Sequence, residues 1–212
     1  DLKAPINTLQ ELLQLYEAKA ISAMEIANIT PRLKANVDQS AYTLNNLIFW
    51  ANSQMKGIRA RPKEINLSTA VSKCIKLFAE QLDRKNIHLQ LDIEKNCTCK
   101  FDPDQMNIIL RNLIYNAIKY SNAEGSIKIN CVHNNADLIL SICDDGIGMN
   151  QNHIDSILNA VEVQSTPGTY QEKGTGIGLS ITMELIKLND AYMTIESEEN
   201  KGSCFNLHLP KV

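Results

Sequence analysis

Three clusters of polar residues and glycines in this 212-residue chain have the composition of a phosphate-binding site. The first lies in the stretch 111–120, where helical spacing places four polar side chains on one side: Asn112, Asn116, Lys119 and Tyr120. An amide oxygen suits Mg²⁺, which also binds nucleotide phosphates, and a lysine one turn away can neutralise the same phosphates. A solvated helix face would carry Glu and Lys instead, because asparagine is a poor helix former.

The other two clusters are rich in glycine. One is Asp-Asp-Gly-Ile-Gly at 144–148, after an apolar run of strand type, and the other is Gly-Thr-Gly-Ile-Gly-Leu at 174–179, before a helical run. Glycines let the backbone approach a ligand closely, and the free N–H groups at a helix start attract phosphate. A carboxylate at a strand end, such as Asp144, can accept a hydrogen bond from an exocyclic amine. Each cluster is weak by itself, and the features of a P-loop or a Rossmann turn are missing.

Composition and charge exclude several classes of protein. Lys and Arg total 21 against 24 Asp and Glu, so the formal charge of −3 provides no basic field for nucleic acid or for an anionic membrane. The sequence has no apolar run long enough to span a membrane and no signal-peptide pattern. We therefore expect this segment to contact neither nucleic acid nor membrane.

Six cysteines are scattered through the chain without a CxxC pair. Most have apolar neighbours in strand-like or helix-like runs, which favours reduced, buried thiols. Cys97 and Cys99 would share one face of a strand, but no His or second Cys pair lies at ligand spacing, so a metal site there is disfavoured. The six are Cys74, Cys97, Cys99, Cys131, Cys143 and Cys204.

The elements that must position the clusters fall into two parts. Up to residue 57 the chain has helical spacing and almost no strand signal, and Ser22 with Glu25 forms a capping box that begins a second helix. The two helices have more apolar surface than one hairpin can bury, so we expect a four-helix bundle formed by two copies. Residues 1–60 are therefore assigned to a helical hairpin that dimerises, and 61–212 to a second domain.

The second domain has strand patterns that alternate irregularly with helical ones. No βαβ unit repeats, so we expect an α+β two-layer sandwich, with helices packed on a mixed sheet. We expect Ser68 and Asp102 to cap helices. The expected strands are 65–67, 87–93, 97–101, 126–132, 137–143, 193–197 and 203–209, and the helices are 68–85, 102–120, 153–160 and 177–188. The buried stripe of the helix at 102–120 is expected to contain Leu110, Leu113, Ile114 and Ala117.

In order and spacing, the three clusters resemble the ATP-binding domain shared by sensor histidine kinases, heat-shock chaperones, type II topoisomerases and mismatch-repair ATPases, the Bergerat or GHKL fold. The resemblance implies ATP and Mg²⁺ as cofactors, Asn116 as the Mg²⁺ ligand, and Asp144 as the residue that recognises the adenine amino group. It implies a lid over the phosphates at about 150–173. The further nucleotide-binding residues that it implies are Asn112, Lys119, Tyr120, Gly146, Gly148, Lys173, Gly174, Thr175, Gly176, Gly178 and Leu179.

Two further stretches resemble sensor histidine kinases in particular. The start of the chain, Asp-Leu-Lys-Ala-Pro-Ile at 1–6, resembles the residues that follow the phosphoacceptor histidine, and 44–54 resembles the distal second helix of the dimerisation domain. The resemblance implies Asp1 as a catalytic residue that orients a histidine expected immediately before it. The resemblance also implies Asn112 as a catalytic residue. Hydrolysing members of the superfamily have a glutamate at this position, which can activate water as a general base. The amide of Asn112 cannot take a proton from water, so hydrolysis is disfavoured.

We therefore expect the cytoplasmic catalytic core of a sensor histidine kinase, either free or as the cytoplasmic part of a membrane-anchored sensor. It would be a homodimer through the hairpin and would transfer the γ-phosphoryl group of ATP to the histidine before Asp1, then to an aspartate of a response-regulator receiver domain. An alternative is a dimeric nucleotide-binding signalling module without catalysis, which would lack that histidine. A third possibility is a stand-alone ATPase whose phosphate release depends on Asn112.

Overall fold

The computed structural model describes residues 59–211, except 95, 134–137, 160–166, 171 and 173–175, together with 10–11, 14–18, 21–22, 24–25, 28–30 and 44. The chain divides into two compact units, residues 1–57 and 58–212, which are considered separately. None of the helices in the described part of the chain combines the length and the apolar content needed to cross a membrane.

In the first unit, the described residues include the predicted capping box. The Ser22 amide and hydroxyl donate to Glu25 Oε2 at 2.9 and 2.8 Å, and the Glu25 amide donates to Ser22 Oγ at 3.2 Å. These bonds satisfy free donors at a helix start, so this prediction is confirmed. Asp1 and most residues of the predicted hairpin lie outside the described residues, and the four-helix bundle stays a prediction.

The second unit is built on a five-stranded mixed sheet with the strand order β2-β4-β5-β7-β6. Strand β2 runs parallel to β4, and every other neighbouring pair is antiparallel. A separate antiparallel pair joins β1 to β3. The bounds are β1 Lys63–Asn66, β2 His88–Ile93, β3 Thr98–Phe101, β4 Ser126–His133, β5 Leu138–Asp144, β6 Tyr192–Glu198 and β7 Gly202–Leu209.

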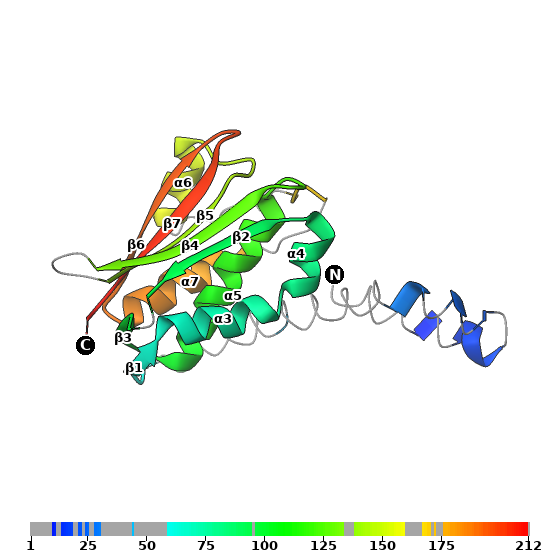
Figure 1. Cartoon of the computed structure of the whole chain (residues 1–212), viewed down its shortest axis with the longest axis horizontal. Helices are drawn as coiled ribbons and strands as arrows, with labels where there is room; N and C mark the ends of the chain where they lie inside the picture. Colours follow the sequence, from blue (N-terminus) through cyan, green and yellow to red (C-terminus); the bar gives the residue numbers. More distant parts are fainter. Residues whose placement is uncertain are drawn as a thin grey trace. The chain divides into compact units, whose positions relative to one another are not determined.

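Helices α3, α5 and α7 lie along one face of this sheet (Figure 1). Helix α5 packs against both α3 and α7, while α6 contacts β6 and α7. This arrangement of helices packed on a mixed sheet confirms the α+β fold predicted for this part of the chain. The bounds are α3 Leu67–Lys76, α4 Ala79–Lys85, α5 Pro103–Tyr120, α6 Gln151–Leu158 and α7 Ile177–Leu188.

The core lies between the helices and the sheet and follows the two periodicities of the sequence. Alternate residues of the central strands are buried, such as Leu140 and Ile142 on β5 and Phe205 on β7. On α5 the predicted stripe is buried in full, which confirms it. Its members are Leu110, Leu113, Ile114 and Ala117.

The helix predicted at 68–85 is wrong in two respects. It is two helices, α3 and α4, and its N-cap is Asn66, whose Oδ1 accepts from the Thr69 amide at 2.9 Å, in place of Ser68. The break turns Phe78 inward, where its ring lies 6.2 Å from that of Tyr115. Burial of one aromatic ring outweighs the helical propensity of the segment. The predicted cap at Asp102 is confirmed by bonds from two backbone amides of the first turn of α5.

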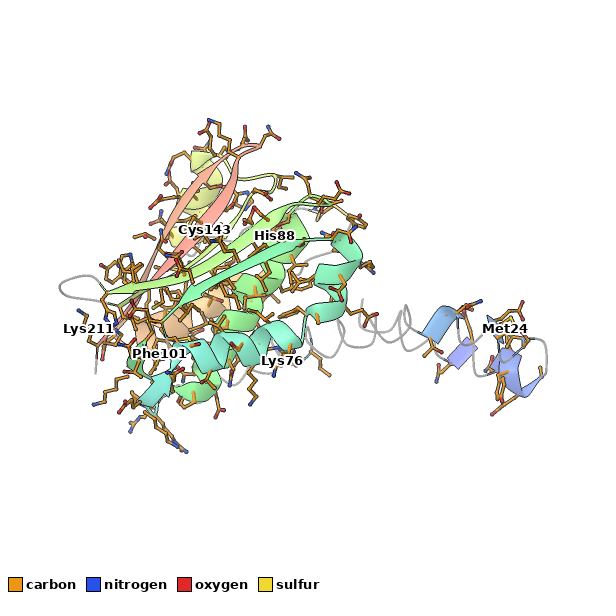
Figure 2. The ribbon with its side chains drawn as sticks, viewed as in Figure 1. Met24, Lys76, His88, Phe101, Cys143 and Lys211 are labelled. Carbon is orange, nitrogen blue, oxygen red and sulfur yellow. A yellow bond between two sulfur atoms is a disulfide. The ribbon has the colours of Figure 1, made fainter. Side chains whose placement is uncertain are left out.

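The prediction that all six cysteines are reduced is wrong for two of them. Cys143 on β5 and Cys204 on β7 lie directly opposite each other and form a disulfide between residues 61 positions apart in the sequence. Both side chains are half-buried and, because residues alternate along a strand, lie on the sheet face opposite the one that α3, α5 and α7 cover. Cys143 is labelled in Figure 2. Strand register brings them together, and spacing along the chain does not reveal it.

The remaining four cysteines are buried free thiols, as predicted. Burial raises the pKa of Cys74 and of Cys99 to about 12, so both thiols stay protonated and unreactive at neutral pH. The other two members are Cys97 and Cys131.

Candidate functional site

The C-terminal half of α5 presents the first cluster to one edge of the core. Asn116 is half-buried, and within the described residues no hydrogen bond engages its side-chain amide. Lys119 is buried, with Nζ 2.9 Å from the Tyr120 hydroxyl and 4.5 Å from the centre of its ring. An available amide and a cation therefore lie one helical turn apart.

Asn112, one turn earlier on α5, has a different environment. It is 1% exposed, and its Nδ2 donates to the Gly178 carbonyl at 3.1 Å and to Thr182 Oγ1 at 3.2 Å. Both acceptors belong to α7, so the amide ties the middle of α5 to the first turns of α7. The two asparagines share a helix face, as the spacing predicts, but only Asn112 is bonded to another helix.

The second cluster begins where β5 ends, with Asp144. Its Oδ1 accepts from the Gly146 amide at 2.9 Å, and the Ser203 amide of β7 also donates to this carboxylate. Burial outweighs these two bonds and raises the pKa of Asp144 to about 6, with a smaller contribution from the charge of Asp145. A carboxylate kept poorly solvated in this way is suited to accept a hydrogen bond from a ligand.

Asp145, the neighbouring acid, has a structural role. Its Oδ2 accepts from the amide and from the hydroxyl of Ser126, both at 2.8 Å, at the start of β4. Asp145 is exposed and joins the end of β5 to the first residue of β4. Of two adjacent carboxylates, only the first lies in the candidate site.

Glycine is required at two positions of this cluster. A Cβ on Gly146 would fall against the Tyr120 carbonyl, and the Ile147 amide donates to the same carbonyl at 3.2 Å. Gly148 has φ +63° and lies against the Glu198 carbonyl. The absence of side chains lets the second cluster pack directly on the end of α5, which brings it beside the first cluster.

The third cluster begins α7. Gly176 is the N-cap, with a left-handed φ of 73°, and Gly178 lies so close to Asn112 that a Cβ would be 3.3 Å from its Oδ1. Leu179 is half-buried in the first turn. The free N–H groups and the dipole of this helix start favour an anion there. The predicted site residues Asp1, Lys173, Gly174 and Thr175 lie outside the described residues.

Comparison with known proteins identifies the domain that contains this site. Residues 101–212 match the family described as "Histidine kinase-, DNA gyrase B-, and HSP90-like ATPase", which is more than half of the chain. The chain belongs to this ATPase family. The stretch matched includes all three clusters and the four C-terminal strands of the five-stranded sheet.

Among its relatives, this ATPase-family chain is similar to sensor histidine kinases. It is 26% identical over 216 residues to the sensor protein SrrB of Staphylococcus aureus strain N315, covering 100% of this chain and 36% of SrrB. The chain therefore spans about a third of the length of the curated relatives it matches. The homology extends over both units of the chain, although the ATPase family itself covers only the second.

Solved histidine kinases share the fold of this ATPase-family chain. The Acinetobacter baumannii histidine kinase AdeS superposes with a TM-score of 0.70 at 22% identity, covering 99% of this chain and 96% of AdeS. Histidine kinase ThkA, in its complex with response regulator protein TrrA, gives a TM-score of 0.68 at 17% identity, over 100% of this chain and 59% of that one.

A Mg²⁺ ion would fit the site of this ATPase domain through amide oxygen. Asn116 offers a half-buried amide with no protein partner among the described residues, and Mg²⁺ completes its shell with water and phosphate oxygens. Across the described part of the chain, no group of three or more His, Cys, Asp and Glu could hold a metal ion.

Two residues outside the predicted set of site residues support this ATPase site. Ser203 bonds Asp144 through its backbone amide, which any residue could supply, and Thr182 accepts from Asn112 through an ordinary hydroxyl of a helix interior. Each gains its function from strand or helix pairing.

Proposed function

We propose that this chain is the catalytic core of a sensor histidine kinase that binds Mg·ATP and transfers its γ-phosphoryl group to a histidine immediately before Asp1. One observation carries the proposal. The Asp144 cluster packs on the end of α5, and the start of α7 is bonded to the middle of the same helix through Asn112. Helix α5 thus carries the proposed metal-binding amide, Asn116. The proposed base-recognising carboxylate, Asp144, and the anion-binding start of α7 lie against this helix.

Asp144 reads the base in this proposal. Its ionised carboxylate accepts a hydrogen bond from the exocyclic amino group of adenine. Guanine has no amino group at the equivalent ring position. The bonds from Gly146 and Ser203 orient the carboxylate, and its raised pKa reflects incomplete solvation, which strengthens a hydrogen bond to a ligand. The site therefore prefers ATP to GTP.

The phosphates lie toward α7. Asn116 would hold Mg²⁺, which would neutralise charge on the phosphate oxygens. Lys119 and Tyr120 contact the nucleotide, and the start of α7, with Gly176, Gly178 and Leu179, receives the phosphate oxygens. The lid at about 150–173 ends with Lys173, and Gly174 and Thr175, which follow it, complete this side.

Asn112 favours phosphoryl transfer over hydrolysis. The position that could activate water holds an amide, which is no general base, and its nitrogen is already bonded to α7. The γ-phosphoryl group then passes to a protein nucleophile. Asp1 orients that histidine, so that its free ring nitrogen attacks phosphorus in line. A P–N bond forms as the bond from the γ-phosphorus to the bridging oxygen breaks, and ADP leaves.

The remaining parts of the proposal concern organisation. Residues 1–60 form the dimerisation and histidine-phosphotransfer hairpin and 61–212 the ATP-binding domain, so the active form is a homodimer. The final acceptor is an aspartate of a response-regulator receiver domain, which the ThkA–TrrA complex supports by its fold similarity. The core works in the cytoplasm, free or attached to a membrane sensor.

The test uses the chain extended by the residues that precede Asp1 in its gene, incubated with Mg²⁺ and ATP labelled at the γ-phosphate. A kinase retains label in an acid-labile, alkali-stable form, which is lost when the preceding histidine is replaced by glutamine. Binding without retained label would favour the dimeric signalling module. Steady phosphate release that disappears in Asn112→Ala, with nucleotide binding intact, would identify a stand-alone ATPase.

A further inference from the structure

Lys85 is the last residue of α4 and is buried within the domain although it is a lysine. It is 2% exposed, and its ammonium group lies among five oxygen acceptors. These are the carbonyls of Ile118 at 2.8 Å, Lys119 at 3.0 Å and Ser121 at 3.5 Å, Thr169 Oγ1 at 2.8 Å and Glu172 Oε1 at 2.8 Å.

These acceptors come from two places in the chain. Three are carbonyls at the C-terminal end of α5, where the helix dipole is negative and carbonyls lack helical partners. The other two belong to the stretch that approaches α7. An ammonium has only three hydrogens, so the acceptors share them, and the long contact to Ser121 is the weakest. Lys85 thus joins the end of α5 to a distant segment.

We call that segment the anchor turn, residues 167–170 with Glu172. The Thr169 amide donates to the Lys119 carbonyl at 3.1 Å, and its hydroxyl donates to the Ser121 carbonyl at 2.6 Å. The Gly168 amide and the Tyr170 amide both bond Glu172, at 3.0 and 2.8 Å, so the turn is closed on itself. A Cβ on Gly168 would collide with Glu172 and with the side chain of Lys119.

The only charge that balances Lys85 among these acceptors is Glu172, whose side chain is 19% exposed. Partial burial acts to raise the pKa of Glu172, but the hydrogen bonds from Lys85 and from backbone amides outweigh it, so the pKa is lowered. Glu172 is therefore ionised at neutral pH. If the anchor turn moved away, Lys85 would stay buried without a counter-charge, a state that is strongly unfavourable in free energy. The pairing of Lys85 with Glu172 therefore favours the docked position of the anchor turn.

We propose that Lys85 is a positioning residue for the phosphate side of the nucleotide site, because it fastens the anchor turn to the end of α5 beside Lys119. The turn ends four residues before Gly176, the N-cap of α7, so it directly precedes the third glycine cluster in the sequence. This inference rests on the proposed nucleotide site. Lys85 contacts no reacting group in this role and acts through Lys119 and the chain that leads to α7.

The decisive variant is Glu172→Gln in the full chain, which keeps the size of the side chain and leaves Lys85 on its three helix carbonyls. We expect affinity for the non-hydrolysable analogue Mg·AMP-PNP to fall about fivefold, measured by competition against a fluorescent ATP analogue. Adenosine, which has no phosphates, should bind with unchanged affinity. Amide exchange in the peptide 168–172, followed by mass spectrometry without nucleotide, should accelerate about tenfold.

Two further variants sharpen this test. Glu80→Gln makes the same chemical change at an exposed position of α4 and should leave affinity and exchange as in the wild type. Lys85→Met should lower the affinity for Mg·AMP-PNP and accelerate amide exchange more than Glu172→Gln does. If Lys85→Met does not fold, Glu172→Gln alone tests the proposal.

The inference is overturned if Glu172→Gln retains wild-type exchange and affinity. An equal loss for AMP-PNP and adenosine, with a lower melting temperature, would also overturn it, because that pattern indicates a structural role alone. If the wild-type chain binds no nucleotide, the proposed function fails, while the exchange measurement still reports whether Lys85 and Glu172 hold the anchor turn.

Discussion

The proposed base side and the proposed phosphate side of the candidate site are held by different kinds of interaction. Asp144 lies at the end of β5, a strand paired along its length with β4 and β7 and bridged to β7 by the Cys143–Cys204 disulfide. The phosphate side depends on separate side-chain bonds, from Asn112 to α7 and from Lys85 to the anchor turn.

This difference matches what each side has to do. A base is recognised by one or two hydrogen bonds of fixed direction, which a continuous ladder of backbone bonds provides. In the proposed function, phosphates and metal must enter and leave, and the described segments on that side are fastened by a few side-chain bonds, which cost less free energy to open than a strand ladder. The proposed site therefore combines one edge held by a strand ladder with another fastened by a few side chains.

Loss of the Asp144 charge should have the largest effect on binding. Asp144→Asn removes the charged acceptor of the adenine amine, and we expect ATP affinity to fall about 100-fold in isothermal titration. The same change relieves an unfavourable buried charge, so the free energy of unfolding at pH 7 should rise, by up to about 3 kcal/mol. Unchanged ATP affinity would refute the adenine assignment.

Acidification should mimic that substitution in the wild type. The pKa of Asp144 is about 6 in the folded domain, above its unfolded value, so the folded state takes up this proton more readily. The stabilisation by protonation is present in acid and is lost as the pH rises through about 6. ATP binding needs the ionised form, so affinity should be about tenfold lower at pH 5 than at pH 7.5, with no such dependence in Asp144→Asn.

The two asparagines of α5 should separate metal binding from helix packing. Asn116→Ala should weaken Mg·ATP binding about tenfold and remove its dependence on Mg²⁺, with little change in the free energy of unfolding. Asn112→Ala leaves the Gly178 carbonyl and the Thr182 hydroxyl without their donor and should cost about 1–3 kcal/mol in urea unfolding. Magnesium dependence that persists in Asn116→Ala would show that another residue is the ligand.

Reduction of the disulfide should affect nucleotide binding least. The bridge acts mainly by restricting the unfolded chain, so a reducing agent should lower the free energy of unfolding by about 2–4 kcal/mol. ATP affinity should stay within about twofold, because the strand ladder still holds Asp144. The double variant Cys143→Ser with Cys204→Ser should be insensitive to the reducing agent. A wild type equally insensitive would mean that the two thiols are not joined in solution.

Much of the α+β domain could be predicted from local pattern. Strand and helix bounds agree with the structure to within a few residues, because alternation of apolar residues and helical stripes record which face is buried. Asp102 and the Ser22–Glu25 pair were recognisable as caps since capping depends on neighbours in sequence. The break at Phe78 was not, because its cause is a ring contact with Tyr115 on another helix.

The site shows the same division. By itself, the sequence determined the three clusters and their order, because residue type and spacing state which groups can bind phosphate, metal or an amine. Only the tertiary structure decided that Asn112 bonds α7 while Asn116 makes no bond to the described residues, that Cys143 meets Cys204, and that Lys85 is buried against Glu172. Each of these depends on which groups distant in the chain meet, and on whether water still reaches them, which spacing along a chain does not encode.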